Sequence, residues 1–156
     1  MERVAAGRDE GLGPSVIERN VEAVREMFRT VEAAVTFDEG RAASGEVPGT
    51  DARTRGESAL RLREHGAFDE TVRWLQRAFA EVRFDEEDVV AAGDRVVLSC
   101  VMRGVHCGSL AGVPPTGRPI AVRQIHVFRL AAGRVVEHRL VEDDLSLLLQ
   151  IGALPW

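Results

Sequence analysis

Residues 120–141 read IAVRQIHVFRLAAGRVVEHRLV, and their hydrophobic pattern is the strongest indication of the fold. Apolar and polar side chains alternate on both sides of Ala131-Ala132-Gly133, a segment whose composition is typical of a tight turn. An alternation with a period of two is typical of a strand that buries one of its faces. We therefore predict an antiparallel hairpin with strands at residues 120–130 and 134–141.

Two further strands are predicted on the N-terminal side of this hairpin. The first runs from residue 82 to a turn at Ala92-Gly93-Asp94, and the second covers residues 95–105. Residues 107–119 are rich in glycine and proline and are expected to form a loop. The four predicted strands follow one another directly in the chain, so we expect an antiparallel meander.

Helical periodicity marks the chain before and after these strands. Residues 16–31 carry apolar side chains at steps of three and four, and Trp74 lies beside a second apolar stripe, in a position that favours the core. This second stripe comprises Phe68, Val72, Leu75, Ala78 and Phe79. Asp143 is placed to cap a last helix at residues 145–150, which ends at Gly152. Helices gathered on one side of a meander define an α+β fold.

The length and composition indicate one domain. We assign residues 1–15 to a flexible lead, residues 16–156 to a single domain and residues 36–55 to a long loop. The net charge of −5 argues against a nucleic-acid surface, and no apolar segment reaches the roughly 20 residues needed to cross a bilayer. Cys100 and Cys107 are predicted to be reduced thiols in a cytoplasmic protein. Nucleotide fingerprints and metal-ligand sets are missing, so we predict no cofactor and no metal.

The polar residues of the hairpin are the candidates for chemistry. Side chains two apart on a strand share a face, and one such set is Val122, Gln124, His126 and Phe128. His138 and Leu140 share a face of the next strand. Gln124, His126 and His138 can therefore meet in one cavity, where a histidine beside an amide is suited to shuttle a proton. The alternative is that each histidine makes one structural hydrogen bond.

Longer motifs carry a resemblance to a known family. They are TVRWL at residues 71–75, GDRV at 93–96, GVPPTGRP at 112–119, RQIHVFR at 123–129, GRVVEH at 133–138, DDL at 143–145 and QIGALP at 150–155. Together they closely resemble the SnoaL-like polyketide cyclases over roughly residues 55–155. The PPTGRP loop, followed at a fixed distance by the FR and EH motifs, is fairly specific to that family.

The resemblance implies the cone-shaped fold of nuclear transport factor 2, in which a curved antiparallel sheet packed on N-terminal helices encloses an apolar pocket. The best-known members of the family close a ring of an aromatic polyketide by intramolecular aldol condensation, without metal or cofactor. Their pocket glutamine and histidine match Gln124 and His126, and their catalytic aspartate falls at Leu140. This leaves His126 as the acid–base group, oriented by Gln124 and assisted by His138. The substrate contacts that we predict are Phe68, Trp74, Met102, Val122, Phe128 and Leu140.

The predicted function is that of a cofactor-independent cyclase or isomerase that acts on a small, hydrophobic, polyketide-like intermediate. One alternative is an epoxide-opening or hydrating enzyme, which requires Asp38, Glu39 or Asp143 to enter the pocket. Another is a non-catalytic ligand-binding or accessory protein. We also expect a homodimer, formed through the sheet face that carries Ile125, Val127, Arg129, Arg139 and Val141.

Overall fold

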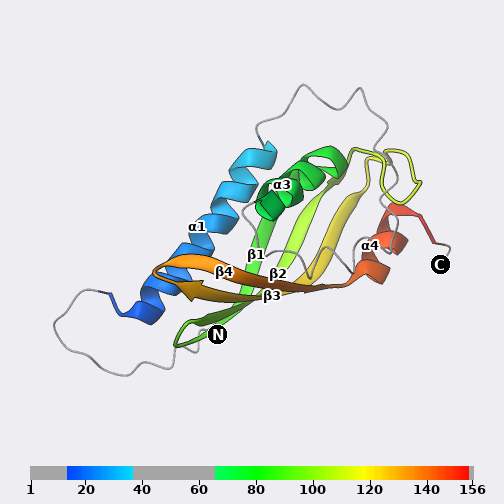
Figure 1. Ribbon diagram of the computed structural model, residues 1–156. Helices are drawn as coiled ribbons and strands as arrows, with labels where there is room; N and C mark the ends of the chain where they lie inside the picture. The colour runs from blue at the N-terminus through cyan, green and yellow to red at the C-terminus, as the bar shows by residue number, and fades with distance from the viewer. Residues whose placement is uncertain (1–13, 37–65, 155–156) are drawn as a thin grey trace.

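The computed structural model describes residues 14–36 and 66–154, with side chains over 14–36 and 71–154. Its elements are α1 (Val16–Thr36), α3 (Gly66–Ala78), β1 (Phe79–Ala92), β2 (Arg95–His106), β3 (Pro119–Ala131), β4 (Arg134–Glu142) and α4 (Asp144–Ile151). Helices α1 and α3 lie on one side of the sheet, and α4 lies at one end of it (Figure 1). The α+β arrangement predicted from the sequence is confirmed. Most of the predicted flexible lead and of the predicted long loop lies outside the described residues.

The four strands form one antiparallel sheet in the order β1-β2-β3-β4. Tight turns join β1 to β2 at Gly93 and β3 to β4 at Gly133, and both glycines have positive φ angles. The sheet is strongly curved and does not close into a barrel (Figure 1). Register shifts interrupt the pairing of β1 with β2 after Ala80 and after Glu86. Such bulges bend a strand, so they contribute to the curvature that gives the sheet a concave face.

Strand β1 begins earlier than the sequence pattern indicates. Phe79, which we predicted on the helical stripe of residues 68–79, pairs with His106 of β2 and is 1% exposed. The prediction was wrong at this position because the apolar stripe of α3 continues directly into the first buried position of β1. An apolar residue at such a junction satisfies the helical period and the strand period alike.

Helix α1 covers the concave face with a single apolar stripe, as its periodicity predicts. A capping box opens the helix: the hydroxyl of Ser15 accepts the N–H of Glu18 at 3.2 Å, and the carboxylate of Glu18 accepts the N–H of Ser15 at 2.6 Å. The buried stripe comprises Val21, Val24, Phe28, Val31 and Val35. The amide of Gln76 in α3 donates to the carbonyl of Ala34 at 2.9 Å, which ties the two helices together.

Helix α4 has the caps that the sequence predicts. The carboxylate of Asp143 accepts the N–H of Ser146 at 2.9 Å, and Gly152 ends the helix with a φ of 85°. The amide of Gln150 makes two hydrogen bonds to the backbone of Ala121, at 2.7 and 2.9 Å. Gln150 thus pairs with β3 as a neighbouring strand would, at a position that β4 does not reach, and this fixes α4 against the sheet.

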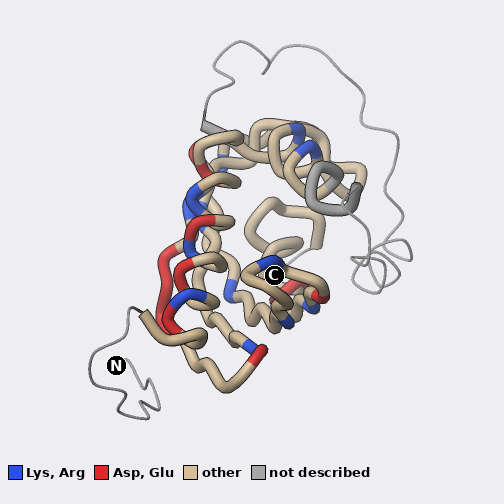
Figure 2. Tube along the Cα trace, turned by 60° about the vertical axis from the view of Figure 1, so that its left-hand side comes forward, with Lys and Arg blue, Asp and Glu red and all other residues tan. Residues whose placement is uncertain are grey.

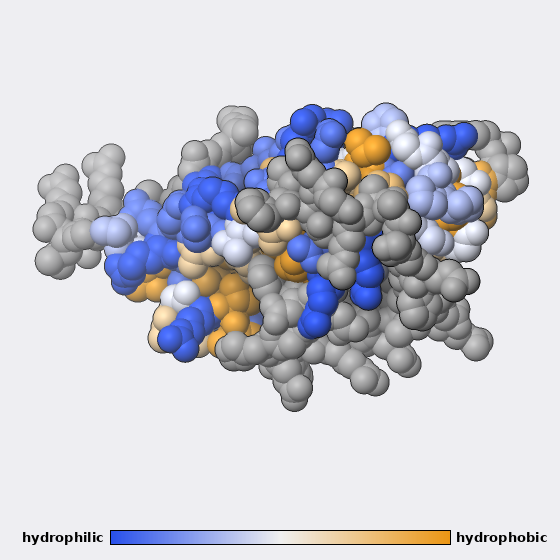
Figure 3. All heavy atoms as spheres, turned by 90° about the horizontal axis from the view of Figure 1, so that it is seen from above, coloured by the Kyte–Doolittle hydropathy of each residue, from blue (hydrophilic) through white to orange (hydrophobic). Residues whose placement is uncertain are grey.

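Two buried apolar clusters flank a polar centre on the concave face. One contains Phe79, Met102, Val122 and Leu147, and the other contains Val24, Val96 and Phe128. Gln124 and His126 lie between them along β3 and are 4% and 5% exposed. Seen from above, the described surface is largely hydrophilic, with its largest hydrophobic patch at the lower left and smaller ones elsewhere (Figure 3). Within the described residues, no helix is long and apolar enough to cross a lipid bilayer.

Candidate active site

The pairing of β3 with β4 brings the predicted polar residues together. Gln124 lies opposite Glu142, and Phe128 lies opposite His138. His126 stands between Gln124 and Phe128 on the same face of β3, where it lies opposite Leu140. The three residues that we predicted to meet, Gln124, His126 and His138, do so on the concave face.

These side chains form one continuous chain of hydrogen bonds. The Nδ1 atom of His126 is 2.9 Å from Nε2 of His138, and its Nε2 atom is 3.0 Å from Oε1 of Gln124. The amide nitrogen of Gln124 donates to the carboxylate of Glu142 at 3.0 Å and lies 3.5 Å from the sulfur of Met102. A buried histidine that is bonded at both ring nitrogens is held in one orientation and one tautomer.

Aromatic rings surround the two histidines. The ring of His138 lies over that of Phe128, with centroids 4.5 Å apart and planes within 8°. From α1, Phe28 meets His126 edge to face, at 4.9 Å and 85°. The two imidazole planes differ by 1° and their centroids are 5.1 Å apart. Because their bonded nitrogens are 2.9 Å apart, the imidazoles lie edge to edge in one plane, the geometry that aims an N–H at a ring lone pair.

Both histidines are neutral at neutral pH. Desolvation, and secondarily the nearby His138, lower the pKa of His126 from 6.5 to about 3. Desolvation lowers the pKa of His138 from 6.5 to about 4. The thiol of Cys100, which lies opposite Gln124 on β2, also stays protonated, because burial raises its pKa to about 12. A neutral imidazole has one nitrogen that can accept a proton, so the pair can act as a base.

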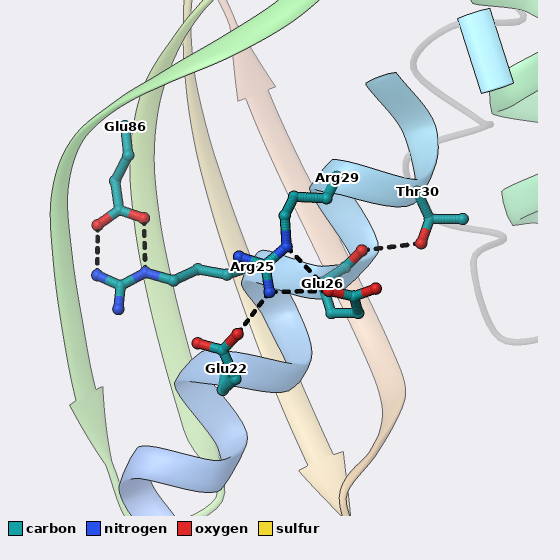
Figure 4. Close-up of polar contacts among 6 residues, drawn as sticks. All are labelled: Glu22, Arg25, Glu26, Arg29, Thr30 and Glu86. Atoms are coloured by element: carbon teal, nitrogen blue, oxygen red, sulfur yellow. Dashed lines mark hydrogen bonds and ion pairs between the residues drawn. The ribbon is translucent and has the colours of Figure 1, made fainter. Parts of the chain in front are cut away.

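A hollow of about 180 Å³ opens beside this network, between α1 and the strands β1 and β2. It is lined by Phe28, Phe84, Leu98 and Cys100 and by the charged residues Arg25, Arg29, Glu32 and Glu86. The guanidinium of Arg25 bonds Glu86 at 2.7 and 2.9 Å, and Arg29 bonds carboxylates of its own helix (Figure 4). Acidic residues of α1 and the adjoining strand line this side of the molecule (Figure 2). Phe28 lines the hollow and also contacts His126, so the hollow adjoins the network.

The residues predicted to contact a substrate differ in their accessibility. Met102, Val122 and Phe128 are at most 1% exposed and belong to the apolar clusters. Leu140 and Trp74 are half-buried, and Trp74 packs edge to face on Phe79 at 5.5 Å. The side chain of Phe68 lies outside the described residues. Contact of these residues with a substrate in an apolar pocket stays a prediction.

The acidic candidates are distributed differently from the histidines. Asp143 is exposed and caps α4, as the capping pattern predicted, so its carboxylate is not in the network. Asp38 and Glu39 lie outside the described residues. Glu142, which sequence reasoning did not single out, accepts the hydrogen bond from Gln124. The alternation that joins His138 and Leu140 extends to residue 142 and could have identified it.

A second buried histidine also escaped the sequence analysis. His106 is fully buried, and its Nδ1 atom is 2.9 Å from the hydroxyl of Thr116 in the loop before β3. Its Nε2 atom has no hydrogen-bond partner among the described residues. Burial lowers its pKa. No group of three potential metal ligands was found in the described part of the chain.

An antiparallel sheet curved around helices, with a buried polar network on its concave face, defines an α+β protein of the nuclear-transport-factor-2-like class. IdmH from Streptomyces antibioticus has a similar solved structure, with a TM-score of 0.62 and 24% identity over 85% of this chain and 98% of that one. A nuclear-transport-factor-2-like protein of unknown function from Burkholderia pseudomallei matches with a TM-score of 0.57 and 20% identity, over 85% and 97% of the two chains. These likenesses confirm the predicted fold class.

Sequence comparison identifies the family within that class. The family model described as SnoaL-like polyketide cyclase matches residues 43–151. The nogalonic acid methyl ester cyclase of Streptomyces nogalater is 35% identical over 100 residues, which cover 60% of this chain and 74% of that protein. An aklanonic acid methyl ester cyclase of Streptomyces peucetius is 36% identical over 96 residues, covering 61% and 66%. The chain belongs to the SnoaL-like polyketide cyclase family, which confirms the resemblance drawn from its motifs.

Proposed function

We propose that this protein is a cofactor-independent cyclase that closes a ring in a polyketide-derived intermediate. The observation that carries the proposal is the buried, neutral network of Gln124, His126 and His138, on the concave face of a chain that belongs to a cyclase family. Its similarity to two methyl ester cyclases favours a polyketide methyl ester as the substrate. The apolar residues around the network suit a hydrophobic intermediate.

An aldol ring closure needs one group that removes a proton beside a carbonyl and later returns a proton to the new alkoxide. Gln124, His126 and His138 together are proposed to supply this group, since the motif resemblance assigns the position of the family's aspartate to Leu140, which cannot exchange a proton. Binding in a closed pocket would bring the two reacting carbons together, and such positioning contributes several kcal/mol to ring closures. No atoms are gained or lost, so the product has the mass of the substrate.

The test is an incubation of the purified protein with aklanonic acid methyl ester and, separately, nogalonic acid methyl ester, followed by liquid chromatography and mass spectrometry. We expect a product of unchanged mass and new retention time, and no such product from the folded His126→Ala variant. A mass increased by one water would replace the proposal with a hydrating enzyme. Ligand binding without conversion would support the accessory function instead.

We also propose that the protein is a homodimer formed through the convex face of the sheet. Ile125 and Val141 lie opposite each other on this face and are 47% and 68% exposed. Exposed apolar side chains among arginines are typical of a subunit interface. Light scattering at micromolar concentration should give twice the mass of the chain, and Ile125→Glu should give the monomer. A wild-type monomer would refute the dimer without affecting the proposed chemistry.

We propose a cytoplasmic location because neither cysteine forms a disulfide. Cys100 and Cys107 are both free thiols, and Cys100 is fully buried. Free thiols are usual in reducing compartments, whereas exported proteins commonly pair them. Fractionation of the producing cells, followed by immunodetection, should place the protein in the cytoplasmic fraction.

A further inference from the structure

Both ring nitrogens of His126 are already engaged within the protein. Nδ1 contacts His138 at 2.9 Å and Nε2 contacts Gln124 at 3.0 Å, in a side chain that is 5% exposed. Any direct proton exchange between His126 and a substrate would require one of these buried hydrogen bonds to break. His126 is therefore well placed to orient a neighbour and poorly placed to touch a substrate.

Glu142 determines which atom donates in each hydrogen bond that links Gln124, His126 and His138. Its carboxylate accepts, so the nitrogen of the Gln124 amide faces Glu142 and the amide oxygen faces His126. An amide oxygen also accepts, so the neutral His126 carries its proton on Nε2 and has a lone pair on Nδ1. The donor to that lone pair is Nε2–H of His138. Neutral His138 is thereby fixed in the tautomer that leaves its Nδ1 unprotonated.

The free nitrogen of His138 is accessible and has no competing partner. His138 is half-buried, and its Nδ1 has no hydrogen bond among the described residues. The face of Phe128 lies 4.5 Å from its ring centre, and an aromatic face stabilises a cation placed over it. The groups that face His126 from α1 and β2 are the uncharged side chains of Phe28 and Leu98, and the protonated thiol of Cys100 lies opposite Gln124.

We propose that Nδ1 of His138 is the atom that takes and returns the proton, and that His126, Gln124 and Glu142 are positioning residues that hold it in the accepting tautomer. This rests on the proposed cyclase function. The proton beside the substrate carbonyl moves to Nδ1, and its bonding electrons form an enolate. The enolate carbon then bonds to the second carbonyl carbon, whose oxygen becomes an alkoxide. The alkoxide takes the proton back from Nδ1, so the enzyme returns to its starting state.

Steady-state kinetics on the full chain tests this assignment. His138→Gln retains an N–H that can donate to His126 and loses the proton acceptor, so kcat should fall at least about 100-fold while KM stays within about threefold. The matched control is Arg139→Gln, the next residue on β4 and on the opposite face, which should retain full turnover. A His138→Gln enzyme with near wild-type kcat overturns the proposal, whereas a wild type without turnover on either ester overturns the cyclase function.

Glu142→Gln supplies a readout that a merely structural role would not give. Loss of the carboxylate removes the charge that favours the cationic form of the network, so the acidic limb of the kcat profile should move to lower pH. An unmoved limb with unchanged kcat would contradict the positioning role of Glu142. Nitrogen-15 NMR of labelled histidines tests the tautomer of His138 without a substrate. The wild-type signals that are missing from the His138→Gln spectrum belong to His138, and they should show an unprotonated Nδ1 at pH 7. A proton on that nitrogen overturns the proposal whether or not the esters are converted.

Discussion

Acidification should destabilise this protein through its two neutral histidines. An unfolded imidazole has a pKa of 6.5, whereas burial holds the pKa of His126 at about 3 and that of His138 at about 4. Below pH 6.5 the unfolded chain therefore binds protons that the folded chain refuses. Each histidine contributes stability that is fully present above pH 6.5 and is lost as the pH falls toward its folded pKa.

The size of this loss at pH 5 depends little on the folded pKa values. A pH of 5 is about 1.5 units below the pKa of an unfolded histidine, and each pH unit corresponds to about 1.4 kcal/mol of folding free energy. The free energy of unfolding should therefore fall by about 2 kcal/mol for buried His126 between pH 7.5 and pH 5. For half-buried His138 the loss is up to about 2 kcal/mol, because solvent reduces the effect.

Urea unfolding followed by tryptophan fluorescence at pH 7.5, 6 and 5 measures this loss. His138→Gln keeps a donor for His126 and removes one titrating group, so its loss between pH 7.5 and pH 5 should be smaller than that of the wild type by up to about 2 kcal/mol. Other groups, such as His106, titrate in both proteins and cancel in the difference. Equal losses in the two proteins would refute the conclusion that folding keeps His138 neutral.

Three further predictions concern the surroundings of the network. Leu140→Asp places a carboxylate opposite His126 and should raise kcat by up to about 100-fold, whereas the control Leu140→Asn should not. An unchanged kcat in Leu140→Asp would show that the lack of an acid at this position does not limit turnover. Gln150→Ala removes both bonds between α4 and β3 and should lower the free energy of unfolding by about 2 kcal/mol in urea. A double-mutant cycle on Arg25 and Glu86 should give a coupling of about 0.5–1 kcal/mol that shrinks in 1 M NaCl, whereas a salt-independent value would contradict a half-exposed ion pair.

Most of the fold could be predicted because its signals are local. Alternation over the strands and glycine at the turns of Gly93 and Gly133 each specify backbone geometry within a few residues. The caps at Asp143 and Gly152 fix the last helix in the same way. The start of β1 at Phe79 could not be predicted, because only its pairing with the distant strand β2 distinguishes it from one more helical position.

The residues of the site could be predicted from the sequence, but the hydrogen bonds and ring contacts between them could not. Strand alternation placed Gln124 and His126 on one face, yet it could not show that both nitrogens of His126 are occupied, because one partner comes from β4. The ring of Phe28 comes from α1, nearly 100 residues earlier, and its contact with His126 depends on how the helix crosses the sheet. Desolvation, which determines the charge of both histidines, arises from this packing and leaves no local trace in the sequence.

The meeting of His126 and His138 depends on one extra residue in β4. Next to the turn, Leu130 pairs with Val135, but beyond the register shift Arg129 pairs with Glu137, so Val136 is the additional residue of a bulge. Without the bulge the register would slip by one, and every later side chain of β4 would change face. His138 would then point away from His126, and the concave face would receive the guanidinium of Arg139. The carboxylate of Glu137 would enter the concave face with it, and desolvating two charged groups is costly even when they pair. The register that protects the core therefore also assembles the proton-accepting pair.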